Sequence, residues 1–247
     1  MPNLITRRAR WAAAAAAALA MVGAAAPAGA GGRYDEPRTY QVTVKSITAH
    51  QPFTPPVIVL HERGARLFKA GRPASVGVRE IAENGNLDPL LAALDAHPAV
   101  ADVAVAAAGD PPPVQPGESA TVMVTGDRWV RRLSLVAMLI CTNDGFAGLD
   151  GIAAPRQVGQ TRVAYADAYD AGSERNTERF ADLVPPCGPL TGVDSGGQGT
   201  GMSNPALAEG GVVRHHEGID GSADLTGDHH GWATDRPVLR IEITRVS

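Results

Sequence analysis

The sequence contains only two cysteines, Cys141 and Cys187, among 247 residues. Two cysteines cannot form the four-cysteine sets of structural zinc sites, and these two do not have zinc-ligand spacing. If the protein is exported, the simplest interpretation is one disulfide bond that encloses residues 142 to 186. Two free thiols are the alternative.

Basic residues are fewer than acidic ones, with 22 Lys and Arg against 26 Asp and Glu, and the formal net charge is −4. A negative balance argues against a nucleic-acid partner, because phosphate binding requires clustered positive charge. It also argues against simple electrostatic binding to anionic lipid, unless a cation bridges the two surfaces.

The sequence has one long hydrophobic run, at its N-terminus. Arg7, Arg8 and Arg10 precede the alanine-rich run from 11 to 26, and a small-residue site follows at 28 to 30. This order is typical of a secretory signal peptide, so we expect cleavage after Ala30 and a secreted or periplasmic protein. Export by the Sec or the twin-arginine route and retention as an uncleaved anchor all remain open. No later run could span a bilayer, so the mature chain is not expected to be transmembrane.

Two motifs of hydrolytic enzymes are missing: a His-Glu-x-x-His helix and a Gly-x-Ser-x-Gly elbow. We therefore predict that the protein is not an enzyme. The alternative is an exported hydrolase or a transition-metal-binding protein that uses the adjacent pairs His215–His216 and His229–His230, because imidazole suits such metals. Adjacent residues on a strand point to opposite faces, so one histidine of each pair at most could converge on a metal.

Several runs alternate between apolar and polar residues, as half-buried strands do. The clearest are 40–47, 129–141, 160–168 and 238–246, with shorter apolar runs at 57–60 and 121–124. Residues 74–95 have helix-compatible spacing. After a disordered lead-in at 31–37, the pattern predicts one domain over 38–247, a mainly β antiparallel sandwich of about eight strands with a short helical insertion.

Two acidic, glycine-punctuated segments, 141–151 and 168–176, flank the run at 160–168. They are interpreted as loops whose oxygen-bearing side chains could form one metal site at an end of the sheet. Calcium prefers about six to eight oxygen ligands, and glycines would let the backbone add carbonyls. Solvated turns without a metal are the alternative, because Asn, Asp and Gly are ordinary turn residues. The candidate ligands are Asn143, Asp144, Asp150, Asp167, Asp170 and Glu174.

The segment Tyr169-Asp170-Ala171-Gly172-Ser173-Glu174 resembles the Trp-Asp-Ala-Gly-Thr-Asp motif of the spondin domain family, in its bacterial exported form. The run from Cys141 to Leu149 resembles the acidic turn that precedes this motif in the family. The resemblance extends over about residues 38–247, with weaker support at 40–48, 81–86, 216–219 and the last strand.

The resemblance implies a β-sandwich similar to C2 domains, with calcium bound in loops at one end and a role in extracellular adhesion. The ligand of such a module would be a protein, a glycan or a membrane surface. Carried over by position, the metal carboxylates are Asp144, Asp170 and Glu174. Three positions depart from the family motif: Tyr169 stands for Trp, Ser173 for Thr and Glu174 for Asp. The longer Glu174 side chain affects the expected mode of chelation.

Overall fold

The structure, a computed structural model, describes residues 36–109, 112–193 and 199–247, which belong to one compact unit. The predicted signal peptide lies outside the described residues, as does most of the predicted lead-in. Among the described helices, none is long and apolar enough to cross a membrane.

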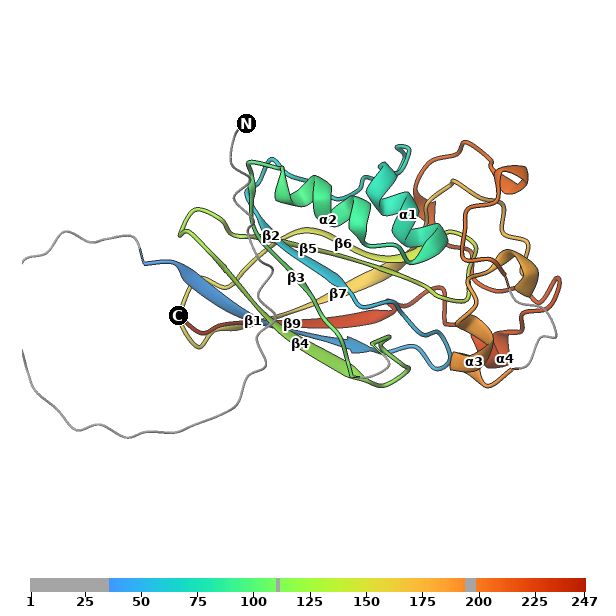
Figure 1. Cartoon of the computed structure of the whole chain (residues 1–247). Helices are drawn as coiled ribbons and strands as arrows, with labels where there is room; N and C mark the ends of the chain where they lie inside the picture. Colours follow the sequence, from blue (N-terminus) through green and yellow to red (C-terminus); the bar gives the residue numbers. More distant parts are fainter. Residues whose placement is uncertain (1–35, 110–111, 194–198) are drawn as a thin grey trace, which may run out of the picture. The chain divides into compact units, whose positions relative to one another are not determined.

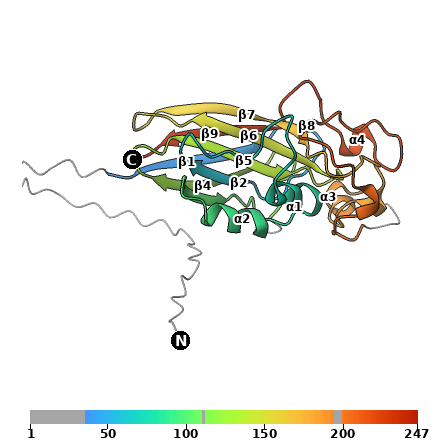
Figure 2. The same ribbon diagram turned by 90° about the horizontal axis from the view of Figure 1, so that it is seen from above.

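Nine antiparallel strands form two packed layers that share β7 (Figures 1 and 2). Their order is β3-β2-β5-β6-β7-β9-β1-β4, and the short β8 also pairs with β7. The two outer strands, β3 and β4, nearly close the sheet, and the Asp102 carboxylate on β3 accepts a hydrogen bond from the Thr125 N–H on β4 at 2.7 Å. The predicted mainly β sandwich is confirmed. The strands are β1 (Arg38–Ser46), β2 (Val57–His61), β3 (Val100–Val105), β4 (Ser119–Gly126), β5 (Arg132–Met138), β6 (Gly145–Ala153), β7 (Thr161–Asp170), β8 (Arg214–His215) and β9 (Leu239–Arg245).

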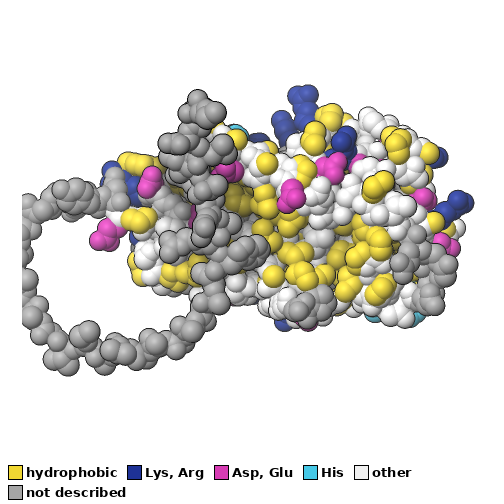
Figure 3. Space-filling view, viewed as in Figure 1, with side chains coloured by type: hydrophobic (Ala, Val, Ile, Leu, Met, Phe, Trp, Pro, Cys, Tyr) yellow, Lys and Arg dark blue, Asp and Glu magenta, His cyan; other side chains and the backbone are white. Residues whose placement is uncertain are grey.

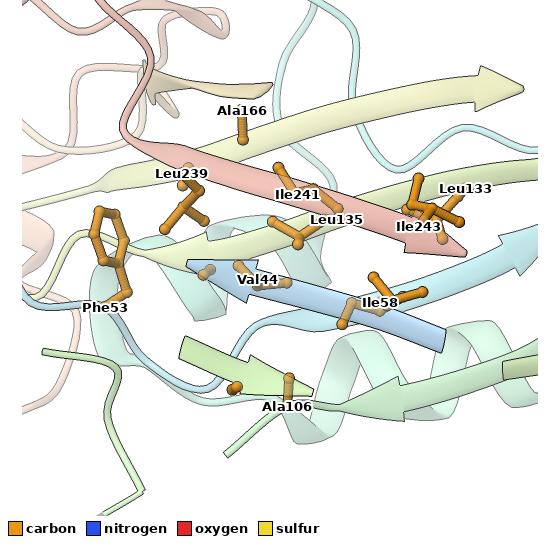
Figure 4. Packing of buried hydrophobic residues seen from close by; sticks show 14 of the residues in the cluster. Val44, Phe53, Ile58, Ala106, Leu133, Leu135, Ala166, Leu239, Ile241 and Ile243 are labelled. Carbon is orange, nitrogen blue, oxygen red and sulfur yellow. The ribbon is translucent and has the colours of Figure 1, made fainter. Parts of the chain in front are cut away.

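The core between the layers consists of the alternate apolar residues of the strands. Val44 on β1, Ile241 and Ile243 on β9, and Leu133 and Leu135 on β5 are completely buried and face one another (Figure 4). Their polar neighbours in sequence lie on the outer face of β1 and β9, which is why period two predicted these strands. Strand β5 is buried on both faces from Leu133 to Met138, because the helices cover its outer side.

The helical insertion predicted at 74–95 is confirmed as α1 (Val76–Asn84) and α2 (Asp88–Asp95). The Ser75 hydroxyl caps α1 by accepting from the Val78 N–H, and Gly85 ends it in the left-handed conformation at φ 65°. The apolar faces of both helices pack on the outer side of β2 and β5 and form a second hydrophobic cluster.

The prediction that residues 141–151 form a single acidic loop is wrong, because β6 begins at Gly145. Only the turn before Gly145 is a loop, and β6 then pairs with β5 and β7. Gly148 does not mark a turn: it lies within the strand, at a position where a larger side chain would clash. A Cβ there would approach the Phe68 ring to 2.6 Å. Strand β3 was not predicted either, since its alanine-rich sequence lacks a clear alternation.

The remaining short elements lie at one end of the sandwich, on the right of Figure 1. These elements are η1 (Phe180–Asp182), α3 (Cys187–Thr191), η2 (Pro205–Leu207) and α4 (Gly227–His230).

Glu178 connects two segments of this end of the sandwich. Its buried carboxylate accepts hydrogen bonds from the backbone N–H groups of Asp220, Gly221 and Ser222. It is the one described non-glycine residue with positive φ, at 54°.

The face turned to the viewer in Figure 1 carries β3 and β4 below the two helices. Hydrophobic side chains occupy much of the middle of this face, and charged side chains gather near its upper edge (Figure 3). This distribution agrees with the burial of β3, most of whose residues are only half-buried.

The predicted disulfide between Cys141 and Cys187 is present, with Cα atoms 5.1 Å apart. It joins the turn after β5 to α3. Both sulfur-bearing side chains lie in the hydrophobic cluster under the helices.

We expect the double substitution Cys141→Ser and Cys187→Ser to lower the free energy of unfolding by about 4 kcal/mol, because the unfolded chain regains the freedom of a long loop. Denaturant unfolding of the oxidised protein and the variant would measure this difference. Reduced wild-type protein should unfold like the variant. Equal stability of all three forms would show that the bridge does not restrain this end of the fold.

Candidate metal site

The three carboxylates expected to bind metal lie at the same end of the sandwich. The pairing of Gly145 with Asp170 places Asp144 beside Ala171, whose N–H donates to the Asp144 carbonyl at 3.0 Å. Asp170 is the last residue of β7, and Glu174 lies in the loop that follows. The relative exposures of Asp144, Asp170 and Glu174 are 0%, 1% and 4%, so none is an ordinary solvated turn residue.

Asp144 links the two segments through one of its carboxylate oxygens. Its Oδ2 accepts from the Ser173 N–H at 2.7 Å, the Glu174 N–H at 3.0 Å and the Ser173 hydroxyl at 3.1 Å. Its Oδ1 is buried and has no hydrogen-bond partner among the residues that the structure describes. A buried carboxylate oxygen without a donor is unfavourable, so this atom could bind a cation.

Asp170 is compensated by partners of the protein itself. Its Oδ1 accepts from the Gly172 N–H at 2.7 Å, and its Oδ2 accepts from the Asn176 amide at 2.8 Å and from the Arg214 guanidinium at 3.0 Å. Arg214 also forms an ion pair with Glu209 at 3.0 Å. An arginine thus already stands beside one of the predicted metal ligands.

In the described part of the chain Glu174 has one hydrogen-bond donor, the Asn204 N–H, at 2.6 Å from Oε1. A cavity of about 400 Å³ lies beside it and is also lined by Glu83, a buried residue of α1. The Glu83 carboxylate accepts from the Ser203 hydroxyl. Sequence reasoning did not identify Glu83 as part of the site, although its stretch supported the family resemblance.

Burial and neighbouring carboxylates raise the pKa values of Asp144 and Glu174. Burial, and then repulsion from Asp170, raises the pKa of Asp144 from 3.8 to about 6. Burial raises the pKa of Glu174 from 4.5 to about 7, with further contributions from Glu83, Asp144 and Asp182, against the opposing Asn204 hydrogen bond. Ionised carboxylates are therefore destabilising here, and a cation would relieve their repulsion.

The other acidic candidates do not join this cluster. Asp150 lies on β6 and forms an ion pair with Arg66 at 2.9 Å, so its assignment to a metal-binding loop is wrong. Asp167 lies on the half-buried outer side of β7. The Asn143 side chain instead holds the loop after β7, because its Oδ1 accepts from the Thr177 N–H at 2.9 Å. In the described part of the chain, no three His, Cys, Asp or Glu side chains are arranged as they stand to hold a metal ion.

Of the four histidines of the alternative interpretation, His229 and His230 have their ring centroids 6.2 Å apart, and the other pair lies at β8. His215 is exposed and stacks on Tyr169, while its neighbour His216 is buried against Trp232, as expected for adjacent residues on a strand. Burial lowers the pKa of His216 to about 4, so it is neutral near pH 7. His230 packs against Phe180.

Comparison with protein families adds one match. The family model described as Spondin_N matches residues 37–177, which include Asp144, Asp170 and Glu174. No curated protein matches the sequence.

The raised pKa of Asp144 predicts how stability changes with pH. The folded protein holds this proton more tightly than the unfolded chain does, so the associated stability is present below the unfolded pKa and is lost as pH rises through about 6. The measurement is the free energy of unfolding of wild type minus that of Asp144→Asn, both in chelator. This difference should fall as pH rises from about 4 to about 6.

The exposed Asp235→Asn serves as the control and should show no such change relative to wild type. Comparison with Asp144→Asn cancels the titration of His216, which both proteins contain. A flat difference curve would contradict the electrostatic account.

Proposed function

The chain belongs to the spondin domain family, and from this premise we propose that it is an extracellular calcium-binding β-sandwich module that serves adhesion or ligand binding and catalyses no reaction. Spondin domains are extracellular and in general non-catalytic. The disulfide between Cys141 and Cys187 agrees with an oxidising compartment.

The single observation that carries the calcium proposal is the Asp144 Oδ1 atom, which is buried without a partner next to two further buried carboxylates. Arg214 pairs with Asp170, and Asn204 donates to Glu174, but no hydrogen-bond donor of the described residues reaches this oxygen. Hard cations such as calcium bind carboxylate and amide oxygens, so the donor set fits calcium better than a soft transition metal.

Asp144, Asp170 and Glu174 would hold the ion. Asp144 offers its unpartnered oxygen, and its Oδ2 keeps it fixed by three hydrogen bonds. Glu174, with one hydrogen-bond donor among the described residues and an extra methylene, can turn its carboxylate most easily. The Asp144 and Gly145 carbonyls already accept from the Ala171 and Leu139 N–H groups, so water would complete the coordination.

Adhesion is proposed from the surroundings of the site. The backbone from 172 to 175 is hydrogen-bonded to the segment 206–211, including Gly211 N–H to the Gly172 carbonyl at 2.6 Å and Glu209 N–H to the Ser173 carbonyl at 3.1 Å. Ion binding at Glu174 would therefore stiffen both segments, which line the cavity beside it. A module whose binding loops are ordered by calcium is suited to calcium-dependent attachment outside the cell.

Calcium should raise the melting temperature of the metal-stripped protein, because a ligand that binds only the folded state stabilises it. The gain is about 2.7 kcal/mol when calcium is one hundred times the dissociation constant. Asp144→Asn should abolish the shift. Asp150→Asn, on β6, should keep it. The calcium proposal is falsified if wild type shows no shift at millimolar calcium.

Arg214 should compete with calcium for Asp170. Arg214→Met removes this competitor, so we expect calcium affinity to rise by up to about fivefold, the equivalent of about 1 kcal/mol for a partly exposed ion pair. The same variant should be less stable without metal. Calorimetric titration would measure the affinity.

Arg175→Met is the matched control, since Arg175 directly follows Glu174 and donates to the Ala206 carbonyl instead of a carboxylate. An equal gain in both variants would mean that only the general loss of positive charge matters.

A further inference from the structure

Strand β7 changes partners halfway along its length, and a groove lies at this point. Residues 161–166 pair with β9, whereas residues 167–170 pair with β6. After Gly148, the described residues of β6 pair with β5 and no longer with β7. The Tyr165 groove, of about 410 Å³, is lined by Arg66, Phe68, Lys69, Ala70, Gly148, Leu149, Asp150, Tyr165, Asp167 and Tyr169.

The floor of the Tyr165 groove is a rigid aromatic stack. The Tyr169 ring lies 4.9 Å from Phe68, 5.6 Å from Phe146 and 4.8 Å from His215, measured between centroids. Gly148 leaves room for these rings, because a Cβ would approach Phe68 to 2.6 Å and Tyr169 to 2.9 Å. A floor that is fixed by packing loses little freedom when a ligand binds.

Tyr165 supplies the accessible aromatic surface. Tyr165 is 51% exposed, and it shares the outer face of β7 with Asp167 and Tyr169 because side chains alternate along a strand. An exposed tyrosine presents an apolar ring and a polar hydroxyl to the same ligand.

The charges that line the groove balance. Arg66 forms an ion pair with Asp150 at 2.9 Å, and Lys69 and Asp167 add one charge of each sign. In the part of the chain that the structure describes, the side chains of Lys69, Asp167, Tyr165 and Tyr169 form no hydrogen bond or ion pair. The groove therefore offers unoccupied donors and acceptors without a net charge.

We propose that the Tyr165 groove binds a neutral glycan. A sugar ring has an apolar C–H face that can stack on Tyr165, and its hydroxyl groups both donate and accept hydrogen bonds, as Lys69 and Asp167 require. An anionic ligand would face Asp150 and Asp167, and a cationic one would face Arg66 and Lys69. The proposal gives a ligand class to the binding module but does not depend on the calcium site.

Affinity electrophoresis in native gels tests this proposal. The gels contain chelator and a soluble neutral polysaccharide: a β-glucan, a cellulose derivative or an α-mannan. Wild type should be retarded by at least one of them. Tyr165→Ala should weaken the apparent affinity by about tenfold, since it removes one aromatic contact.

Val163→Ala is the matched control, because Val163 is 41% exposed on the same strand and face but does not line the groove. It should bind like wild type. Thermal melting verifies that both variants fold. The proposal is overturned by no retardation in any neutral gel, by retardation in a sulfated polysaccharide alone, or by equal loss in Tyr165→Ala and Val163→Ala. Because chelator is present throughout, failure here leaves the calcium proposal unaffected, and the reverse also holds.

Discussion

The hydrogen bonds of Asp144 hold together the turn after β5 and the loop after β7. One carboxylate oxygen accepts three bonds from Ser173 and Glu174, which fixes the loop against the strand ends. The same burial that makes these bonds strong isolates the other oxygen from water. The end of the sandwich is thus ordered around a charge that the protein neutralises only in part.

Arg214 shows how the fold tolerates this charge without a metal. It is the first residue of β8, far along the chain from Asp170, and forms ion pairs with Asp170 and Glu209. A guanidinium can balance Asp170 from the partly exposed side but does not reach a hydrogen bond with Asp144. A cation between the carboxylates would neutralise the charge that Arg214 does not balance. The disulfide holds the turn in place whether or not a cation is bound.

The sequence predicted those parts of the structure whose signals are local. Strands β1 and β9 were found because each buries one face, and the helical insertion was found because its apolar residues recur at helical spacing. Strand β6 was missed because its glycines and Asp150 are typical of turns. The strand accommodates these residues because Phe68 packs on Gly148 and Arg66 forms an ion pair with Asp150.

At the site, the family resemblance identified three carboxylates that are buried at one end of the sandwich, but not their surroundings. Glu83 and Arg214 enter through contacts between segments distant in sequence, which no local pattern reveals. The roles of Asp144, Asp170 and Glu174 as calcium ligands stay a prediction.

Anomalous diffraction from crystals grown with calcium tests the central claim most directly. The account predicts one anomalous peak within about 2.3–2.6 Å of the Asp144 Oδ1 atom, with Glu174 turned towards it. A structure in which Asp144 keeps its unpartnered oxygen and calcium is absent, or binds elsewhere on the molecule, would contradict it.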